Sequence, residues 1–264
     1  KTKFKLDVMQ IEENHILIQN SSIYYKKVTP QNATNTLILL HDSLGCTVLW
    51  RDWLDILAQE LNVSVLSYDR RGYGKSSNYT VPRPINYLEQ EAQILDELIE
   101  KLELKNVHLF GFSDGASVAT IYAGMFPDKI HSLTIEGVHV LIEQETLAGI
   151  RQAKHTLETT QIAKVLEKYH GDKVMDLYLA WTETWVSESH QAWNIEHFIP
   201  QIKAPILVFQ GEFDEFGTAA QMDAFDKAPN AQKYWVLGAG HTAHKEKKEE
   251  VFEKVTSFIK QHLV

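Results

Sequence analysis

Short apolar runs alternate with amphipathic stretches along this chain, and this alternation is the feature that most limits its fold. The runs cover residues 36–41, 63–68, 107–110, 132–135, 206–209 and 233–237. The first five are typical of strands that are buried on both faces of a sheet, and residues 233–237 are a last candidate strand. Helical periodicity marks residues 87–102, 116–125 and 249–263 between and after them. The alternation predicts an α/β protein with a mostly parallel sheet.

Two regions depart from this rhythm. Residues 4–11 and 16–26 resemble an antiparallel start to the sheet, with Asn20-Ser21 as a turn signal. Residues 139–200 contain no convincing buried strand and are helical in pattern, with many aromatic residues. We therefore expect a core formed by residues 1–138 and 201–264, and a helical cap formed by residues 139–200.

Composition limits the class of protein further. With 44% apolar and 23% charged residues among 264, the chain can bury a sizeable core. The net charge of −9 leaves no basic excess for nucleic acid. The lone Cys46 excludes an internal disulfide framework and a cysteine-based zinc cluster. No stretch is apolar enough for a signal peptide or a membrane span, so we expect a cytoplasmic protein.

The strongest motif is Gly111-Phe112-Ser113-Asp114-Gly115, between a strand-like run and a helix rich in small residues. G-x-S-x-G in this context is a nucleophile elbow, which exposes the serine hydroxyl on a strained turn. Side chains larger than hydrogen at positions 111 and 115 would collide with neighbouring backbone. Ser113 is therefore the expected nucleophile, and the backbone N–H of Asp114 can stabilise an oxyanion.

A serine hydroxyl needs a general base, and the base needs an acid to orient it. His241 follows the last expected strand within Gly238-Ala239-Gly240-His241 and is the expected base; His244 is the alternative. Asp214 follows the run at 206–209 and is the expected acid. The alternatives to Asp214 are Glu136, at the end of the preceding strand, and the neighbouring residues Glu212 and Glu215.

These segments together resemble the α/β-hydrolase superfamily, and within it the small capped serine hydrolases that include esterases, enol-lactonases and carbon–carbon bond hydrolases. The resemblance extends to residues 41–45 and to the loop at residues 69–76, which is structural in that family. It implies the α/β-hydrolase fold: a mostly parallel eight-stranded sheet flanked by helices, with a helical cap inserted after the sixth strand.

The resemblance also suggests a second oxyanion donor and narrows the choice of relatives. By analogy with the family's His-Gly-x loop, the N–H of Ser43 is that donor, although Asp42 stands where glycine is usual. A serine nucleophile sets aside dehalogenases and epoxide hydrolases, which attack with aspartate. The iminopeptidases have a Trp-Gly-containing elbow, which is absent here.

The sequence thus predicts a serine hydrolase that cleaves a small carboxylic ester or related acyl substrate through an acyl-enzyme, with no metal or organic cofactor. His139, Trp181 and Trp185 are the expected pocket residues. Two alternatives stay open. One is a carbon–carbon bond or enol-lactone hydrolase, in which Arg51, Arg70, Arg71, Arg151 or cap histidines could bind a substrate carboxylate. The other is a non-catalytic sensor of a small ligand.

Overall fold

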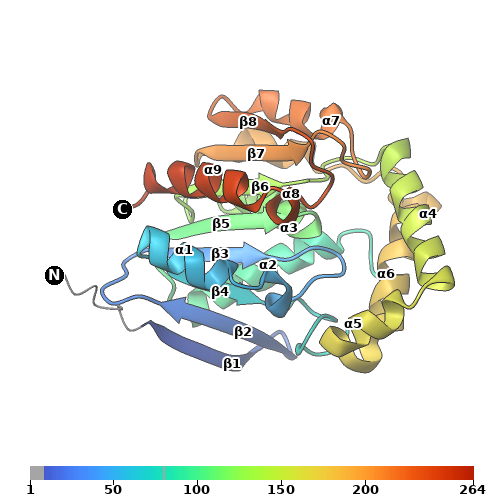
Figure 1. The fold of residues 1–264 in the computed structure, drawn as a ribbon, viewed down its shortest axis with the longest axis horizontal. Coiled ribbons are helices and arrows are strands. Elements are labelled where there is room, and N and C mark those ends of the chain that lie inside the picture. Colours follow the sequence, from blue (N-terminus) through green and yellow to red (C-terminus); the bar gives the residue numbers. More distant parts are fainter. Residues whose placement is uncertain (1–8, 80) are drawn as a thin grey trace.

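The computed structural model describes residues 9–79 and 81–264, which form an eight-stranded sheet with the strand order β1-β2-β4-β3-β5-β6-β7-β8 (Figure 1). The strands are β1 (Gln10–Ile18), β2 (Ser21–Thr29), β3 (Thr36–Leu40), β4 (Ser64–Tyr68), β5 (Val107–Phe112), β6 (Ser132–Glu136), β7 (Ile206–Gly211) and β8 (Ala231–Val236). From β4 to β8 in this order all neighbours are parallel, and β1 and β2 are antiparallel. The predicted mostly parallel sheet is confirmed.

The N-terminal hairpin differs from the prediction in its position along the chain. β1 and β2 are joined at Gln19-Asn20, where φ is 47° and 64°, as a tight two-residue hairpin turn requires. The expected strands at 4–11 and 16–26 are therefore misplaced, and residues 4–8 of the first lie outside the described residues. β1 is an edge strand exposed along most of its length, so it lacks the apolar alternation that would mark its ends.

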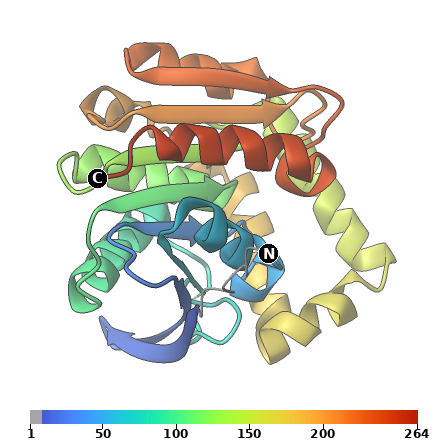
Figure 2. The same ribbon diagram turned by 60° about the vertical axis from the view of Figure 1, so that its left-hand side comes forward.

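Helices cover both faces of the sheet because the strands are apolar on both faces (Figures 1 and 2). Leu37 and Leu39 pack with α1 (Trp53–Leu61) and α9 (Lys248–Lys260) on one face. Ile38 and Leu40 pack with α2 (Tyr87–Lys101) and α3 (Asp114–Met125) on the other. Successive side chains of a strand point to opposite faces, so one short apolar run contributes to both layers of the core.

Between β6 and β7 the chain leaves the sheet and forms α4 (Gln144–Thr159), α5 (Ile162–His170) and α6 (Val174–Val186). These helices lie beyond the carboxyl ends of the parallel strands (Figure 1). The remaining helices are α7 (Ala219–Asp223), α8 (Ala243–Glu246), and the 3₁₀ helices η1 (Thr47–Trp50), η2 (Gly171–Lys173), η3 (Glu188–His190), η4 (Glu196–Gln201) and η5 (Ala224–Lys227).

Within the described ranges, no helix has the length and apolar character needed to cross a bilayer. The cytoplasmic location stays a prediction.

Two side chains at the end of α5 and in η2 tie these helices to loops of the sheet. The buried His170 donates from Nε2 to the Leu44 carbonyl at 2.9 Å and accepts the Gly74 N–H on Nδ1 at 2.8 Å. Lys173 Nζ donates to the carbonyl oxygens of Gly74 and Ser76, both at 2.6 Å. The inserted helices are thus anchored to the loops that follow β3 and β4.

Buried histidines should make the fold sensitive to acid, and His108 provides a test. Its ring lies 2.7 Å from Ser132 Oγ, and burial lowers its pKa to about 4. An unfolded histidine has a pKa near 6.5. Between these values the unfolded chain takes up a proton that the folded chain excludes, so stability falls as the pH falls from about 6.5 to about 4.

We expect His108→Gln to weaken this dependence. At pH 7 the variant should be less stable than the wild type, but the loss on going to pH 4.5 should be smaller by about 2 kcal/mol. Urea denaturation at both pH values measures the difference. The exposed His155, changed to glutamine, is the control and should retain the wild-type dependence. Equal losses in the wild type and His108→Gln would contradict the prediction.

Candidate active site

The turn from β5 into α3 exposes Ser113 at the carboxyl edge of the sheet. Ser113 has φ 54° and ψ −120°, a conformation that is unfavourable for a residue with a side chain. Neighbouring glycines make this turn possible, since a Cβ on Gly115 would lie 2.1 Å from the Leu40 carbonyl oxygen and one on Gly111 would lie 2.4 Å from the Gly115 carbonyl oxygen. The turn therefore holds the hydroxyl at the N-terminus of α3, where negative charge is favoured.

His241 connects Ser113 to Asp214 through two hydrogen bonds. His241 Nε2 lies 3.0 Å from Ser113 Oγ, and Nδ1 lies 2.9 Å from each carboxylate oxygen of Asp214. With its proton on Nδ1, the imidazole donates to Asp214 and accepts the serine O–H. The structure thus brings together the three expected residues, from the ends of β5, β7 and β8, in the geometry of a nucleophile, a base and an orienting acid.

The charges of this pair shift both pKa values. Burial lowers the pKa of His241, but the charge and hydrogen bond of Asp214 raise it more, so that it lies above its ordinary value. Burial also raises the pKa of Asp214, and the interaction with His241 outweighs this effect and lowers it. The aspartate therefore stays ionised and stabilises the imidazolium that forms when His241 takes a proton.

The alternative residues have other partners. His244 Nδ1 lies 2.9 Å from Glu136 Oε2, and Glu136 Oε1 accepts the backbone N–H of His244 at 2.9 Å. Glu212 accepts the Gly238 N–H at 2.9 Å, and Glu215 accepts the backbone N–H of His241 at 3.2 Å. None of these contacts joins the serine, so these residues surround the group of three without entering it.

The loop after β3 lies beside the elbow and offers a second backbone donor. Among the described residues, the N–H groups of Ser43 and Asp114 have no hydrogen-bond partner, and both residues line the same pocket. Asp42 does not have a positive φ, so aspartate fits where glycine is usual. Its Oδ1 occupies the space beside Gly45, 2.0 Å from where a Cβ would lie, so a larger residue at position 45 would have to displace the Asp42 side chain.

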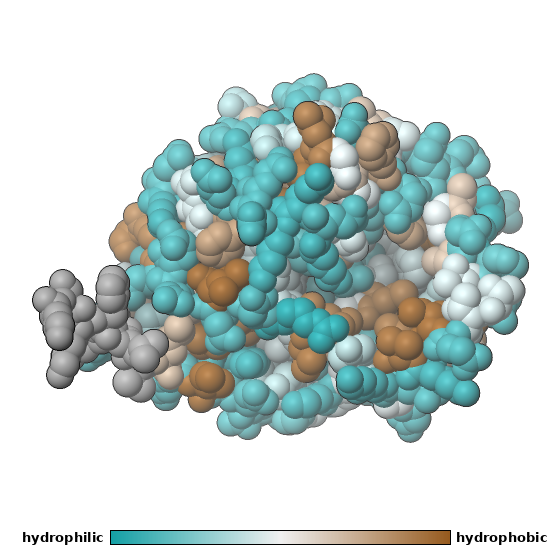
Figure 3. All heavy atoms as spheres, viewed as in Figure 1, coloured by the Kyte–Doolittle hydropathy of each residue, from teal (hydrophilic) through white to brown (hydrophobic). Residues whose placement is uncertain are grey.

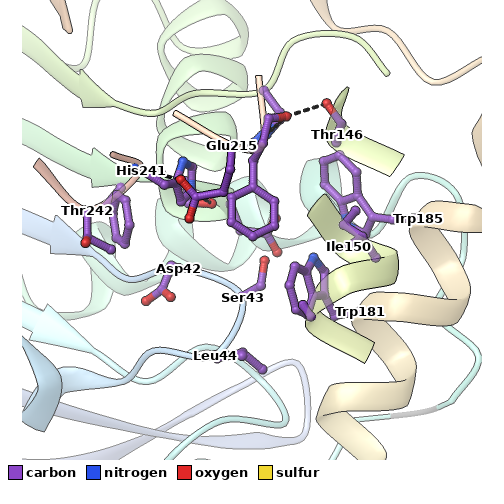
Figure 4. A pocket seen from close by; sticks show the side chains of 16 residues that line it. Asp42, Ser43, Leu44, Thr146, Ile150, Trp181, Trp185, Glu215, His241 and Thr242 are labelled. Atoms are coloured by element: carbon purple, nitrogen blue, oxygen red, sulfur yellow. Dashed lines mark hydrogen bonds between the residues drawn. The ribbon is translucent and has the colours of Figure 1, made fainter. Parts of the chain in front are cut away.

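A pocket of about 210 Å³ lies between these groups and the inserted helices (Figure 4). Trp181 and Trp185 of α6 and His139 form part of its wall. Ile150 and Phe216 also line it, and the Phe216 ring centroid lies 4.8 Å from that of His241. Neither of these two residues could be identified from the sequence, because single apolar residues carry no motif. A hollow with apolar side chains nearby is visible on the surface (Figure 3).

The charged residues that line the pocket are acidic. Asp42, Asp114 and Glu215 contribute to its wall, and the described lining contains no lysine or arginine. The Asp114 carboxylate is partly compensated, because it accepts the Tyr87 O–H at 3.2 Å and lies 3.6 Å from Arg70 Nη2. Within residues 9–79 and 81–264, no group of three histidine, cysteine or acidic residues is arranged to hold a metal ion.

Comparison with known proteins gives the family. The sequence profile described as alpha/beta hydrolase fold matches residues 35–190. The human serine hydrolase BPHL is 28% identical over 191 residues, which are 69% of this chain and 64% of that protein. The chain thus spans less than two thirds of that relative. A proline iminopeptidase of Lactobacillus helveticus is 24% identical over 96% of this chain and 99% of its own length.

The lack of a Trp-Gly-containing elbow does not exclude kinship with the iminopeptidases, because one of them matches almost the whole chain. Among solved structures, 2-hydroxy-6-oxo-6-phenylhexa-2,4-dienoate hydrolase from Rhodococcus sp. strain RHA1 matches with a TM-score of 0.77 and 16% identity, covering 95% of this chain and 99% of that one. At this identity the likeness concerns the fold. The matching profile, the eight-stranded sheet and the elbow together place the chain in the α/β-hydrolase family.

Proposed function

We propose that this chain is a serine hydrolase that cleaves small, uncharged carboxylic esters by acyl transfer. The observation that carries the proposal is the pair of hydrogen bonds from His241 to Ser113 and to Asp214, at the wall of a pocket. We further propose that residues 139–200 act as the cap of this pocket, since α4 and α6 contribute Ile150, Trp181 and Trp185 to its wall.

The reaction begins when His241 Nε2 takes the proton of Ser113 and Oγ attacks the ester carbonyl. The tetrahedral intermediate collapses, His241 returns the proton to the leaving alcohol, and the acyl group stays on Oγ. Water then attacks the acyl-enzyme with His241 again as base, and the acid leaves. Asp214 holds the imidazole in the required tautomer and stabilises its charge throughout.

The carbonyl oxygen becomes negative in each tetrahedral intermediate and needs fixed donors. The N–H groups of Ser43 and Asp114 supply them in this proposal. Support comes from the position of both residues on the pocket wall and from the lack of another partner for either N–H among the described residues. Removing one such donor typically costs 10²- to 10³-fold in kcat.

The charge of the pocket favours a neutral ester over the carboxylate-bearing diketone of a carbon–carbon bond hydrolase. Arg51 donates to Tyr169 and Arg71 to Glu91, and Arg151 is exposed outside the pocket lining. Arg70 is buried against backbone carbonyl oxygens. With Asp42 and Glu215 in the wall, a substrate carboxylate would meet like charge. A neutral lactone, as a cyclic ester, fits the same chemistry.

Covalent labelling tests the nucleophile. A fluorophosphonate should react at Ser113 with loss of fluoride, and Ser113→Ala should abolish labelling and lower kcat/KM for a short p-nitrophenyl ester by about 10⁵-fold. Ser43→Ala is the matched control and should retain labelling, because Ser43 acts through its backbone N–H. Labelling in folded Ser113→Ala would contradict the proposal. Ligand-dependent stabilisation of the wild type without labelling or turnover would instead indicate a sensor.

The pH dependence tests His241. Because the neutral imidazole is the base and its pKa lies above the ordinary value, kcat/KM should fall with acid through a midpoint above about 6.5. Asp214→Asn should lower kcat by about 10⁴-fold and move the midpoint of the residual activity to lower pH, since the raising charge is gone. A rate that stays constant down to pH 4 in the wild type would contradict this role.

Substrate charge tests the proposed preference for neutral esters. At pH 8, p-nitrophenyl butyrate should have a kcat/KM at least about 10-fold above that of mono-p-nitrophenyl glutarate, because two uncompensated like charges at short range cost on the order of 1 kcal/mol or more. Glu215→Gln should narrow this ratio, and added salt should narrow it in the wild type. Equal rates for both esters at low salt would contradict the preference.

A further inference from the structure

Arg70 is a buried cation that contacts residues at both proposed oxyanion donors. Its side chain is fully buried, and Nη2 donates to the carbonyl oxygens of His41 at 3.2 Å and of Asp42 at 3.0 Å. The same Nη2 lies 3.6 Å from the carboxylate of Asp114. One guanidinium group therefore contacts both the loop after β3 and the first residue of α3.

The contact with Asp42 determines the direction of the Ser43 N–H. Asp42 C=O and Ser43 N–H belong to one peptide unit, which is trans. In a planar trans peptide these two bonds point in opposite directions. A donor that holds the Asp42 oxygen on the side of Arg70 thus turns the Ser43 N–H to the opposite side. The Asp42 oxygen also accepts from His41 Nδ1 at 2.8 Å and from the Gly45 N–H at 3.2 Å, so Arg70 is one of three donors that fix this peptide plane.

The same residue also binds the loop through its backbone. The N–H of Arg70 donates to His41 Nε2 at 3.0 Å, and His41 Nδ1 lies 2.8 Å from the Asp42 carbonyl oxygen. Burial keeps the pKa of His41 well below its ordinary value, so the ring stays neutral and can accept this bond. The oxyanion loop is thus fixed at successive carbonyl groups by contacts from residue 70.

Two other buried arginines near Arg70 make different contacts. Arg71 Nε donates to Glu91 at 2.7 Å, and Arg83 Nη1 donates to the Tyr73 hydroxyl at 2.9 Å. Neither has a hydrogen bond to the loop after β3 within the described part of the chain. Burying a guanidinium group is unfavourable unless it is paired. The partners of Arg71 and Arg83 are side chains, and these contacts hold neighbouring segments together. Arg70 instead contacts the loop after β3 and Asp114, which are the residues beside Ser113.

We propose that Arg70 is a positioning residue that aligns both oxyanion donors, Ser43 N–H through the Asp42 carbonyl and Asp114 N–H through the Asp114 carboxylate. This inference rests on the proposed serine hydrolase activity. Arg70 touches no reacting atom. Its removal should therefore weaken binding of the transition state and leave binding of the ground-state ester nearly unchanged.

Arg70→Met tests this role in ester hydrolysis. We expect kcat to fall about 10²-fold, with KM changed by less than about 3-fold and the pH midpoint unchanged. Affinity for an alkylboronic acid, whose tetrahedral adduct occupies the oxyanion site, should fall in parallel with kcat. Arg83→Met is the matched control for losing a buried arginine and should leave kcat within about 3-fold. Circular dichroism establishes that each variant is folded.

A second comparison separates alignment from simple charge neutralisation. Arg70→Met leaves the Asp114 carboxylate uncompensated, and adding Asp114→Asn removes that charge. The double variant should regain thermal stability, yet its kcat should stay at least about 10-fold below that of Asp114→Asn alone, because the Asp42 carbonyl still lacks the guanidinium donor that faces away from the pocket. Equal kcat values for these two variants, or an unchanged kcat in folded Arg70→Met, would overturn the proposal. A wild type without hydrolysis or labelling would instead refute the proposed function itself.

Discussion

The close approach of α3 to the end of β3 is the constraint on which the arrangement of the site depends. Gly115 lies so near the Leu40 and His41 carbonyl groups that any side chain there would overlap with them. This contact brings the elbow and the loop after β3 to the same point. The surrounding strands hold Ser113 in its strained conformation. The packing that forms the core therefore also offsets the conformational energy of this strained backbone.

Buried polar side chains then hold the loops at this edge of the sheet. Asp69 accepts the N–H groups of Thr47 and Lys75 at 2.7 and 2.8 Å, as expected for a structural residue. His170 of the inserted helices bonds to the Leu44 carbonyl and the Gly74 N–H, an arrangement that requires a neutral ring. Burial lowers the pKa of His170 and favours that form. The inserted helices, which contribute to the wall of the pocket, therefore also support the loop after β3.

Local patterns were sufficient to predict the inner strands and the residues brought together with Ser113, because a buried parallel strand is apolar throughout and each site residue follows such a strand. Local patterns were insufficient where contacts between residues distant in sequence determine the structure. The exposed β1 lacks a readable alternation, and Phe216 carries no motif although it packs against His241. Arg70 was a candidate for binding a substrate carboxylate, but its partners are backbone carbonyl groups from a loop distant in sequence.

The choice of acid illustrates how packing resolves what the sequence leaves open. Four acids and two histidines are candidates in the sequence, and the fold pairs two of the acids with the two imidazoles, Asp214 with His241 and Glu136 with His244. The Phe112 ring contacts both imidazoles, with centroids 5.2 and 4.8 Å away. Glu136 also accepts the His244 N–H, so its carboxylate anchors the loop that carries His241. Asp214 is thus the carboxylate in contact with the His241 imidazole, whereas Glu136 contacts the backbone and the ring of His244.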